Sequence, residues 1–168
     1  TDETGGNEST LIRSDFGSDG LDADRWVLDS GDDETGEVRG DRFYSRSPKR
    51  SHDAGRLQSA EAFEVRGRVR VEARAKLHDL TSWDGRIAEL FFTETDGTVG
   101  VVELNNTSDT ALVVSRSGPD IPGRNVELAP RVETTEWHVY AFTVDLDAGT
   151  VTEVTRDGES FDESVDVA

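Results

Sequence analysis

The stretch FEVRGRVRVEARAKL, residues 63–77, alternates apolar and charged side chains with a period of two. One parity is apolar except for Gly67, and the other parity consists entirely of charged residues. Because successive side chains of a β-strand point to opposite faces of a sheet, this pattern predicts a strand with one buried and one solvated face. Gly67 is expected to start the strand or to form a bulge. A strand of this kind is typical of an antiparallel sheet.

The same signal recurs in shorter segments along the chain, and no stretch of ten residues shows the apolar spacing of three and four that a helix requires. Turn signals such as Asp96-Gly97 and Asp157-Gly158 separate the segments. The sequence therefore predicts an all-β fold, an antiparallel β-sandwich of jelly-roll type. Further strands are expected at residues 25–28, 43–46, 55–59, 87–93, 98–104, 111–115, 126–128, 137–145 and 150–156.

The length of 168 residues predicts one domain. Residues 1–10 contain no apolar side chain and are expected to form a disordered linker or tail, with the single sandwich domain at residues 11–168. The chain has no cysteine, which excludes a disulfide scaffold, a thiolate zinc site and a thiol nucleophile. No apolar run approaches the roughly 18 residues of a membrane-spanning helix, so membrane insertion is not expected.

The charge is strongly negative, with 36 Asp and Glu against 18 Lys and Arg and a formal net charge of −18. Such a chain repels the phosphates of nucleic acid, so a nucleic-acid partner is not expected. Of the 18 cations, 16 are Arg and only Lys49 and Lys76 are Lys. Abundant Asp with few Lys resembles proteins of extreme halophiles, whose carboxylates keep the surface hydrated in molar salt. The alternative is an acidic domain from a mesophile.

Several passages, taken in order, carry a family resemblance. They are DF and LDADRW within residues 15–26, GRLQS at 55–59, GRVRVEARAKL at 67–77, WDG and FF within 83–92, EWHVY at 136–140 and DGE at 157–159. Together they resemble the concanavalin-A-like lectin and glucanase superfamily, specifically its laminarinase-type branch, glycoside hydrolase family sixteen. The resemblance implies a concanavalin-A-like sandwich and a carbohydrate ligand.

In that family one strand, E-x-D-x-x-E, carries the catalytic carboxylates. A retaining glycosidase needs a nucleophile and an acid about 5 to 5.5 Å apart. The matching segment here is GTVGVVE, residues 97–103, with Thr98 at the nucleophile position and Gly100 at the middle position. Only Glu103 remains, at the acid and base position. Because a hydroxyl and a hydrogen cannot replace two carboxylates, the resemblance supports the fold without the hydrolase activity.

Two alternatives stay open at this strand. A shifted alignment puts Glu94 and Asp96 on the first two positions, although Asp96-Gly97 is more naturally a hairpin turn. Glu103, in turn, can be one of many solvated surface acids rather than a functional residue.

The charged parity of residues 63–77 is a candidate binding surface, with Arg68 and Arg70 at its centre. Arginine binds carboxylate or sulfate through paired hydrogen bonds, so this stripe suits an acidic glycan. The alternative is that neighbouring strands supply carboxylates that neutralise it through cross-strand ion pairs.

The aromatic and histidine residues add few candidates. Trp83 is the strongest ligand-contact candidate, because the resemblance places it in a loop that leads to the family's cleft. Trp137 has apolar neighbours on both parities and is expected in the core. The three histidines, His138 among them, are isolated in the sequence and show no metal-ligand spacing, and His138 is expected to be a half-buried strand residue. No cofactor is expected; a structural calcium, common in the superfamily, would use Asp15 or Asp145.

The sequence thus predicts a non-catalytic, extracellular, lectin-like carbohydrate-binding module of a halophile, with ligand contacts from Trp83, Glu103, Arg68 and Arg70. Glycosylation sequons at Asn105 and Asn106, in an expected polar turn, favour a secreted or cell-surface protein. One alternative is a glycoside hydrolase or polysaccharide lyase with a rearranged site, in which Glu103 is one catalytic carboxylate. Another is a structural cell-surface subunit.

Overall fold

A computed structural model of the chain describes residues 10–13, 21–29, 36–39, 42–45, 56–76, 85–93, 99–106, 111–118, 121–130, 136–161 and 165–166. Within these ranges all regular secondary structure is β-strand, and every strand pairing is antiparallel. The prediction of an all-β chain is confirmed for this part of the protein. Contacts divide the chain into two compact units, residues 1–64 and 65–168, and each unit has its own sheets.

The first unit contains two small sheets. Strand β1 (Trp26–Asp29) pairs with β4 (Arg56–Ser59), and β2 (Gly36–Arg39) pairs with β3 (Arg42–Ser45). A turn precedes β1, in which the backbone N–H of Trp26 donates to the carbonyl of Asp22 at 2.9 Å. Strands β1, β3 and β4 match the predicted segments to within one residue, whereas β2 was not predicted, because Val38 is its single apolar side chain.

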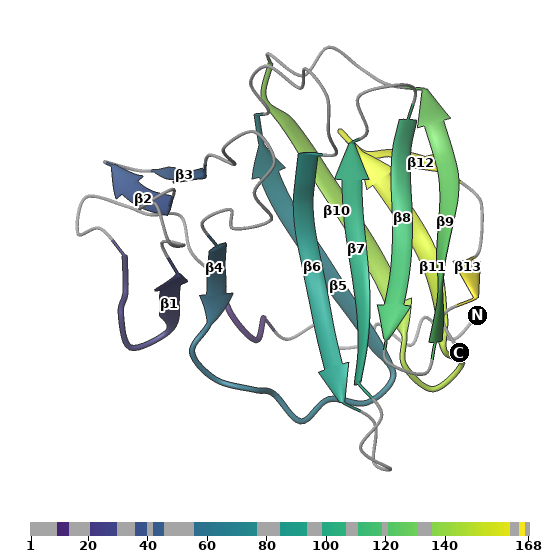
Figure 1. Cartoon of the computed structure of the whole chain (residues 1–168), viewed down its shortest axis with the longest axis horizontal. Helices are drawn as coiled ribbons and strands as arrows, with labels where there is room; N and C mark the ends of the chain where they lie inside the picture. The colour runs from purple at the N-terminus through teal and green to yellow at the C-terminus, as the bar shows by residue number, and fades with distance from the viewer. Residues whose placement is uncertain are drawn as a thin grey trace, which may run out of the picture. The chain divides into compact units, whose positions relative to one another are not determined.

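The second unit contains two larger sheets, whose strand orders are β12-β11-β10-β5, with β13 also paired to β11, and β6-β7-β8-β9 (Figure 1). Of these strands, β12 and β13 were not predicted, and β8 and β9 extend past the predicted segments. The strands are β5 (Arg68–Ala75), β6 (Gly85–Thr93), β7 (Val99–Asn106), β8 (Ala111–Gly118), β9 (Ile121–Pro130), β10 (His138–Asp145), β11 (Thr150–Arg156), β12 (Glu159–Phe161) and β13 (Val165–Asp166).

The alternating stretch forms β5, whose residues are exposed and half-buried in strict turn. The strand begins after Gly67 rather than at Phe63, and Gly67 has a φ of +73°. Its carbonyl accepts a hydrogen bond of 2.8 Å from the backbone N–H of Leu146, at the end of β10. A left-handed φ is open to glycine without a steric cost, which explains why the glycine marks the start of the strand.

The core of the second unit draws on both of its sheets. One buried cluster contains residues of β7 together with residues of β10 and β11. Each fully buried large apolar side chain stabilises the fold by about 1.5–3 kcal/mol relative to an exposed one. The members of the cluster are Val102, Leu104, Tyr140, Phe142, Val144, Val151 and Val154.

Strand β11 carries a β-bulge that explains its irregular sequence pattern. Thr143 of β10 pairs with Glu153, but the next residue, Val144, pairs with Val151. One extra residue on β11 therefore resets the alternation, and Val151 and Val154 are both buried although they are three positions apart. The strand at residues 150–156 was expected from the sequence, and the bulge explains why its apolar residues do not alternate strictly.

A two-residue hairpin joins β11 to β12. Arg156 and Glu159 pair across it, and the two turn residues, Asp157 and Gly158, have φ values of 53° and 82°. Positive φ at both central positions is the geometry of a type I′ turn, which favours Asp-Gly. The predicted turn at this dipeptide is confirmed.

Candidate functional site

One face of the β5–β10–β11 sheet lies opposite the buried cluster. On β10 the core residues alternate with Val139, Ala141, Thr143 and Asp145, so these four belong to the other face. We call this surface the arginine face. Its accessible members are Arg68, Arg70, Glu72 and Arg74 on β5, Val139, Thr143 and Asp145 on β10, and Glu153 on β11, whereas Ala141 and Thr155 share the parity of this face but are buried.

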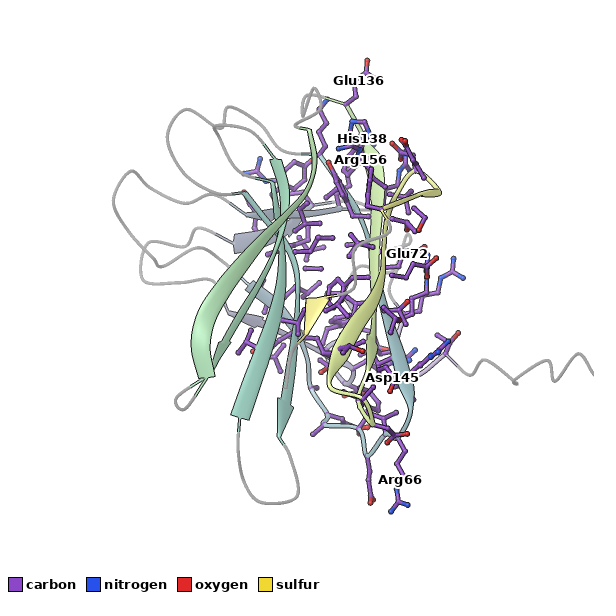
Figure 2. All side chains as sticks on the ribbon, turned by 90° about the vertical axis from the view of Figure 1, so that its right-hand side faces the viewer. Arg66, Glu72, Glu136, His138, Asp145 and Arg156 are labelled. Atoms are coloured by element: carbon purple, nitrogen blue, oxygen red, sulfur yellow. The ribbon has the colours of Figure 1, made fainter. Side chains whose placement is uncertain are left out.

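The arginine face is electrically balanced within a strongly acidic chain. It holds three arginines, Arg68, Arg70 and Arg74, and three carboxylates, Glu72, Asp145 and Glu153, so its formal charge is zero while that of the chain is −18. Figure 2 shows the direction of this sheet through labelled side chains, with Arg66 and Asp145 toward one end, Glu72 further along and His138 and Arg156 at the other end.

Two of the arginines make cross-strand ion pairs. Nε of Arg68 lies 3.4 Å from Oδ2 of Asp145, its register partner on β10. Nη1 of Arg70 donates to Oε2 of Glu153 at 3.1 Å, and its Nη2 lies 3.4 Å from Oε2 of Glu72. The expected neutralisation by neighbouring carboxylates is therefore present. Both arginines nevertheless stay accessible, with 71% of the Arg68 side chain and 42% of the Arg70 side chain exposed.

The third arginine, Arg74, contacts an aromatic ring instead. Its guanidinium carbon lies 5.3 Å from the centre of the Trp137 ring, within the range of a cation–π contact. Trp137 is 37% exposed, so the expectation that it is a core residue is wrong. It precedes the first residue of β10, His138, whose partner on β5 is the terminal residue Ala75. At this end of the sheet a tryptophan is only partly covered by neighbouring strands.

Asp145 closes the turn between β10 and β11. Its Oδ1 accepts hydrogen bonds from the backbone N–H groups of Asp147 and Ala148, at 3.1 and 2.9 Å. The bond from Ala148, helped by the neighbouring Arg68 guanidinium, holds the pKa of Asp145 below its ordinary value. Asp145 was a calcium candidate in the sequence, and both of its carboxylate oxygens have protein partners.

A histidine–aspartate pair lies at the opposite end of the sheet. Nδ1 of His138 is 2.6 Å from Oδ2 of Asp157, and the backbone N–H of Val139 donates to Oδ1 of Asp157 at 2.9 Å. The hydrogen bond from His138, and after it the one from Val139, lowers the pKa of Asp157. Because a carboxylate only accepts, the imidazole must carry its proton on Nδ1 toward Asp157.

The sequence did not reveal this pair. His138 is half-buried, as expected, but it is not isolated in the structure, because the β11–β12 turn brings Asp157 beside it. Two signals in the sequence were available. One is the Trp137-His138 dipeptide at the start of β10, and the other is the Asp157-Gly158 turn after β11. Neither signal specifies that the two segments meet.

The remaining predicted site residues are described in part or not at all. Glu103 lies in β7, paired in register with Glu89 of β6 and Ser115 of β8. Gly100, at the middle position of the family motif, lies in the same strand and pairs with Phe92. The other residues named in the sequence, Trp83, Thr98, Glu94, Asp96 and Asp15, fall outside the described residues. Asn105 and Asn106 are the last two residues of β7, rather than part of a turn.

The described residues contain no group of three or more His, Cys, Asp or Glu residues that could hold a metal ion. They also contain no helix of the length and apolarity that crossing a membrane requires.

Comparisons of the chain with protein-family models, with curated proteins and with solved structures gave no match. The resemblance to the concanavalin-A-like superfamily therefore remains a prediction from the residues themselves.

Proposed function

We propose that this chain is a non-catalytic, lectin-like carbohydrate-binding module, and that Trp137, which contacts Arg74 at the end of the arginine face, contacts the ligand. The single observation that carries the proposal is the exposed indole of Trp137, beside the guanidinium of Arg74. Apolar faces of sugar rings pack on exposed aromatic rings, while guanidinium groups donate hydrogen bonds to sugar substituents. An aromatic ring and a polar donor side by side are the elements of such a subsite.

A sandwich architecture is part of the proposal. We infer that the two sheets of the second unit pack face to face as an antiparallel β-sandwich of the concanavalin-A-like, jelly-roll type. The support is the buried cluster, to which Leu104 of one sheet and Phe142 of the other both belong. Sheet-on-sheet packing places side chains of two inner faces in one core and leaves the outer faces for ligands.

The proposal extends to the organism and the location of the protein. We propose a secreted or cell-surface protein of a halophile, supported by the net charge of −18 and the sequons at Asn105 and Asn106. Carboxylates dispersed over the sequence keep a surface hydrated in molar salt, where the Debye length falls to about 3 Å.

The test is a binding screen of the full chain against a glycan array in molar KCl, combined with a reducing-sugar assay. Binding without turnover is expected. Trp137→Ala should weaken binding to the best glycan at least about tenfold, the loss expected for one ring–sugar contact. Tyr44→Ala is the matched control, because Tyr44 is also an exposed aromatic with an arginine, Arg39, over its ring at 5.9 Å.

The same screen separates the other functional classes. Turnover that is lost in Glu103→Gln would replace this proposal with a hydrolase or lyase. Binding that depends on Trp83, but not on Trp137, would move the site to the loop around Trp83 that the sequence favoured. The absence of both binding and turnover would favour a structural subunit.

A further inference from the structure

We infer that the ligand is an anionic glycan and that Arg74 receives its carboxylate or sulfate group. This inference rests on the proposed carbohydrate binding and adds the chemical class of the ligand. The inference comes from a difference in partners. Arg68 and Arg70, which precede Arg74 on the same face of β5, contact carboxylates, whereas Arg74 contacts an aromatic ring.

Arg68 and Arg70 each have a carboxylate partner, and Arg74 does not have one among the residues that the structure describes. Glu72 lies between Arg70 and Arg74 in the strand, two positions from each, and its carboxylate contacts Arg70. In a chain with twice as many acids as bases, an arginine without an acidic partner is an available anion site.

Within the described part of the structure, the interaction of Arg74 is the ring contact with Trp137, and no carboxylate occupies its guanidinium group. A guanidinium that lies over an aromatic ring is attracted through its face, whereas its N–H groups point outward from its edges. Those edges match the two oxygens of a carboxylate or sulfate and bind them bidentately. In this proposal the ring of Trp137 holds the cation in place, and the sugar ring that carries the anion packs on the exposed part of Trp137.

The rest of the arginine face extends the site along the strand. Arg70 lies four positions from Arg74, about 13.6 Å along the strand with Glu72 between them, and Arg68 lies about 6.8 Å further on, so a polyanion bound at Arg74 would reach these two arginines only beyond Glu72. Arg68 is held by one contact of 3.4 Å and is 71% exposed, so it can exchange Asp145 for a ligand. Arg70 is held by Glu153 and Glu72 and is the least available of the three. The expected order of contributions to binding is Arg74, then Arg68, then Arg70.

The proposed experiment measures binding of the full chain to three polysaccharides by calorimetry, in KCl concentrations at which circular dichroism shows a folded protein. The probes are polygalacturonate, which carries carboxylates, dextran sulfate, which carries sulfates, and neutral dextran. Arg74→Gln removes the charge and keeps a polar side chain of moderate length. Arg39→Gln is the matched control, because Arg39 makes the same kind of cation–π contact in the other unit and its loss changes the net charge equally.

The expected result is binding to at least one anionic polysaccharide, with a preference for it over neutral dextran. Arg74→Gln should weaken that binding about tenfold, the loss of one charge-assisted bidentate contact, whereas Arg39→Gln should change it less than about twofold. Arg74→Lys keeps the charge without the paired donors, so its affinity for the anionic polysaccharide should lie between that of Arg74→Gln and that of the unmodified chain. The two anionic probes show whether the site takes carboxylate or sulfate.

The inference is overturned if Arg74→Gln and Arg39→Gln weaken anionic binding equally, or if Arg74→Gln folds and binds like the unmodified chain. Binding to neutral glycans alone would also overturn it and would leave the proposed carbohydrate binding intact. Failure to bind any glycan on the array or any of the three probes would instead contradict the proposed function itself.

Discussion

The carboxylate of Asp157 lies 2.6 Å from the imidazole of His138, although the two residues are 19 positions apart in the sequence. Asp157 also makes two hydrogen bonds with the backbone of Val139, because its N–H donates to the Val139 carbonyl at 2.7 Å and its side-chain Oδ1 accepts from the Val139 N–H. The β11–β12 turn is thereby fastened to the start of β10. These contacts join the ends of three strands of one sheet, β10, β11 and β12.

The Asp157–His138 contact predicts a pH-dependent contribution to stability. The pKa of Asp157 is lowered in the folded state, mainly by its hydrogen bond with His138. Its contribution is therefore fully present above the pKa of the unfolded chain, about 3.9, and is lost as the pH falls through the lower folded-state pKa. Asp157→Asn should reduce the melting temperature near pH 6 by on the order of 3 °C and flatten its decline in acid.

Asparagine is the informative substitution because it tolerates the left-handed φ of 53° at this position. Asp147→Asn removes the same charge from an exposed turn residue at the opposite end of the sheet and serves as the control. If both variants show the same acid profile, the pair does not contribute to the pH dependence.

The ion pair between Arg70 and Glu153 predicts a small coupling energy. The Nη1–Oε2 distance is 3.1 Å, but the two side chains are 42% and 44% exposed, and solvent screens their attraction. A double-mutant cycle with Arg70→Gln and Glu153→Gln should give about 0.2–1 kcal/mol, measured by urea denaturation. The pair Arg74 and Glu153, which is not in contact within the described part of the structure, should give a value near zero. A coupling above about 2 kcal/mol would show that the pair is shielded from solvent.

The shared core predicts that both sheets of the second unit unfold together. Phe142→Ala should cost about 3–5 kcal/mol and Leu104→Ala about 2–5 kcal/mol, because both side chains are fully buried. Val65→Ala, at a residue that is 36% exposed, should change the free energy of unfolding by less than about 0.5 kcal/mol. Far-ultraviolet circular dichroism and tryptophan fluorescence should report the same urea midpoint for each variant. If Phe142→Ala and Leu104→Ala shifted two different transitions, the two sheets of the second unit would have independent cores.

The charge of the chain predicts stabilisation by salt. Raising KCl from about 0.2 M to about 3 M should increase the melting temperature by on the order of 10 °C at pH 7, because screening reduces the repulsion within a chain of net charge −18. At about pH 4, where many carboxylates are protonated, the same change in KCl should have a much smaller effect. An equal effect at both pH values would assign the stabilisation to a general influence of salt on apolar burial rather than to charge.

The sequence was most informative where a local pattern has a single structural solution. Alternation along β5 can bury one face only as a strand, and the Asp157-Gly158 dipeptide suits a turn with two positive φ values. For that reason the all-β content, most strand positions and this turn could be predicted. Alternation also identified Arg68 and Arg70 as neighbours on one charged face, which the register of β5 and β10 confirms.

The tertiary structure decided the features that depend on residues distant in the sequence. The bulge that buries both Val151 and Val154 exists only in relation to β10, and the partner of His138 comes from a different turn. Trp137 is a large apolar residue with apolar neighbours in the sequence, which is typical of a core residue. It is exposed because it precedes the paired part of β10, and its ring contacts Arg74. The sequence by itself determined which side chains share a face, since that follows from the backbone period. Which of them are covered, paired or left accessible was decided by the neighbouring strands, since burial and ion pairing depend on what lies across the sheet.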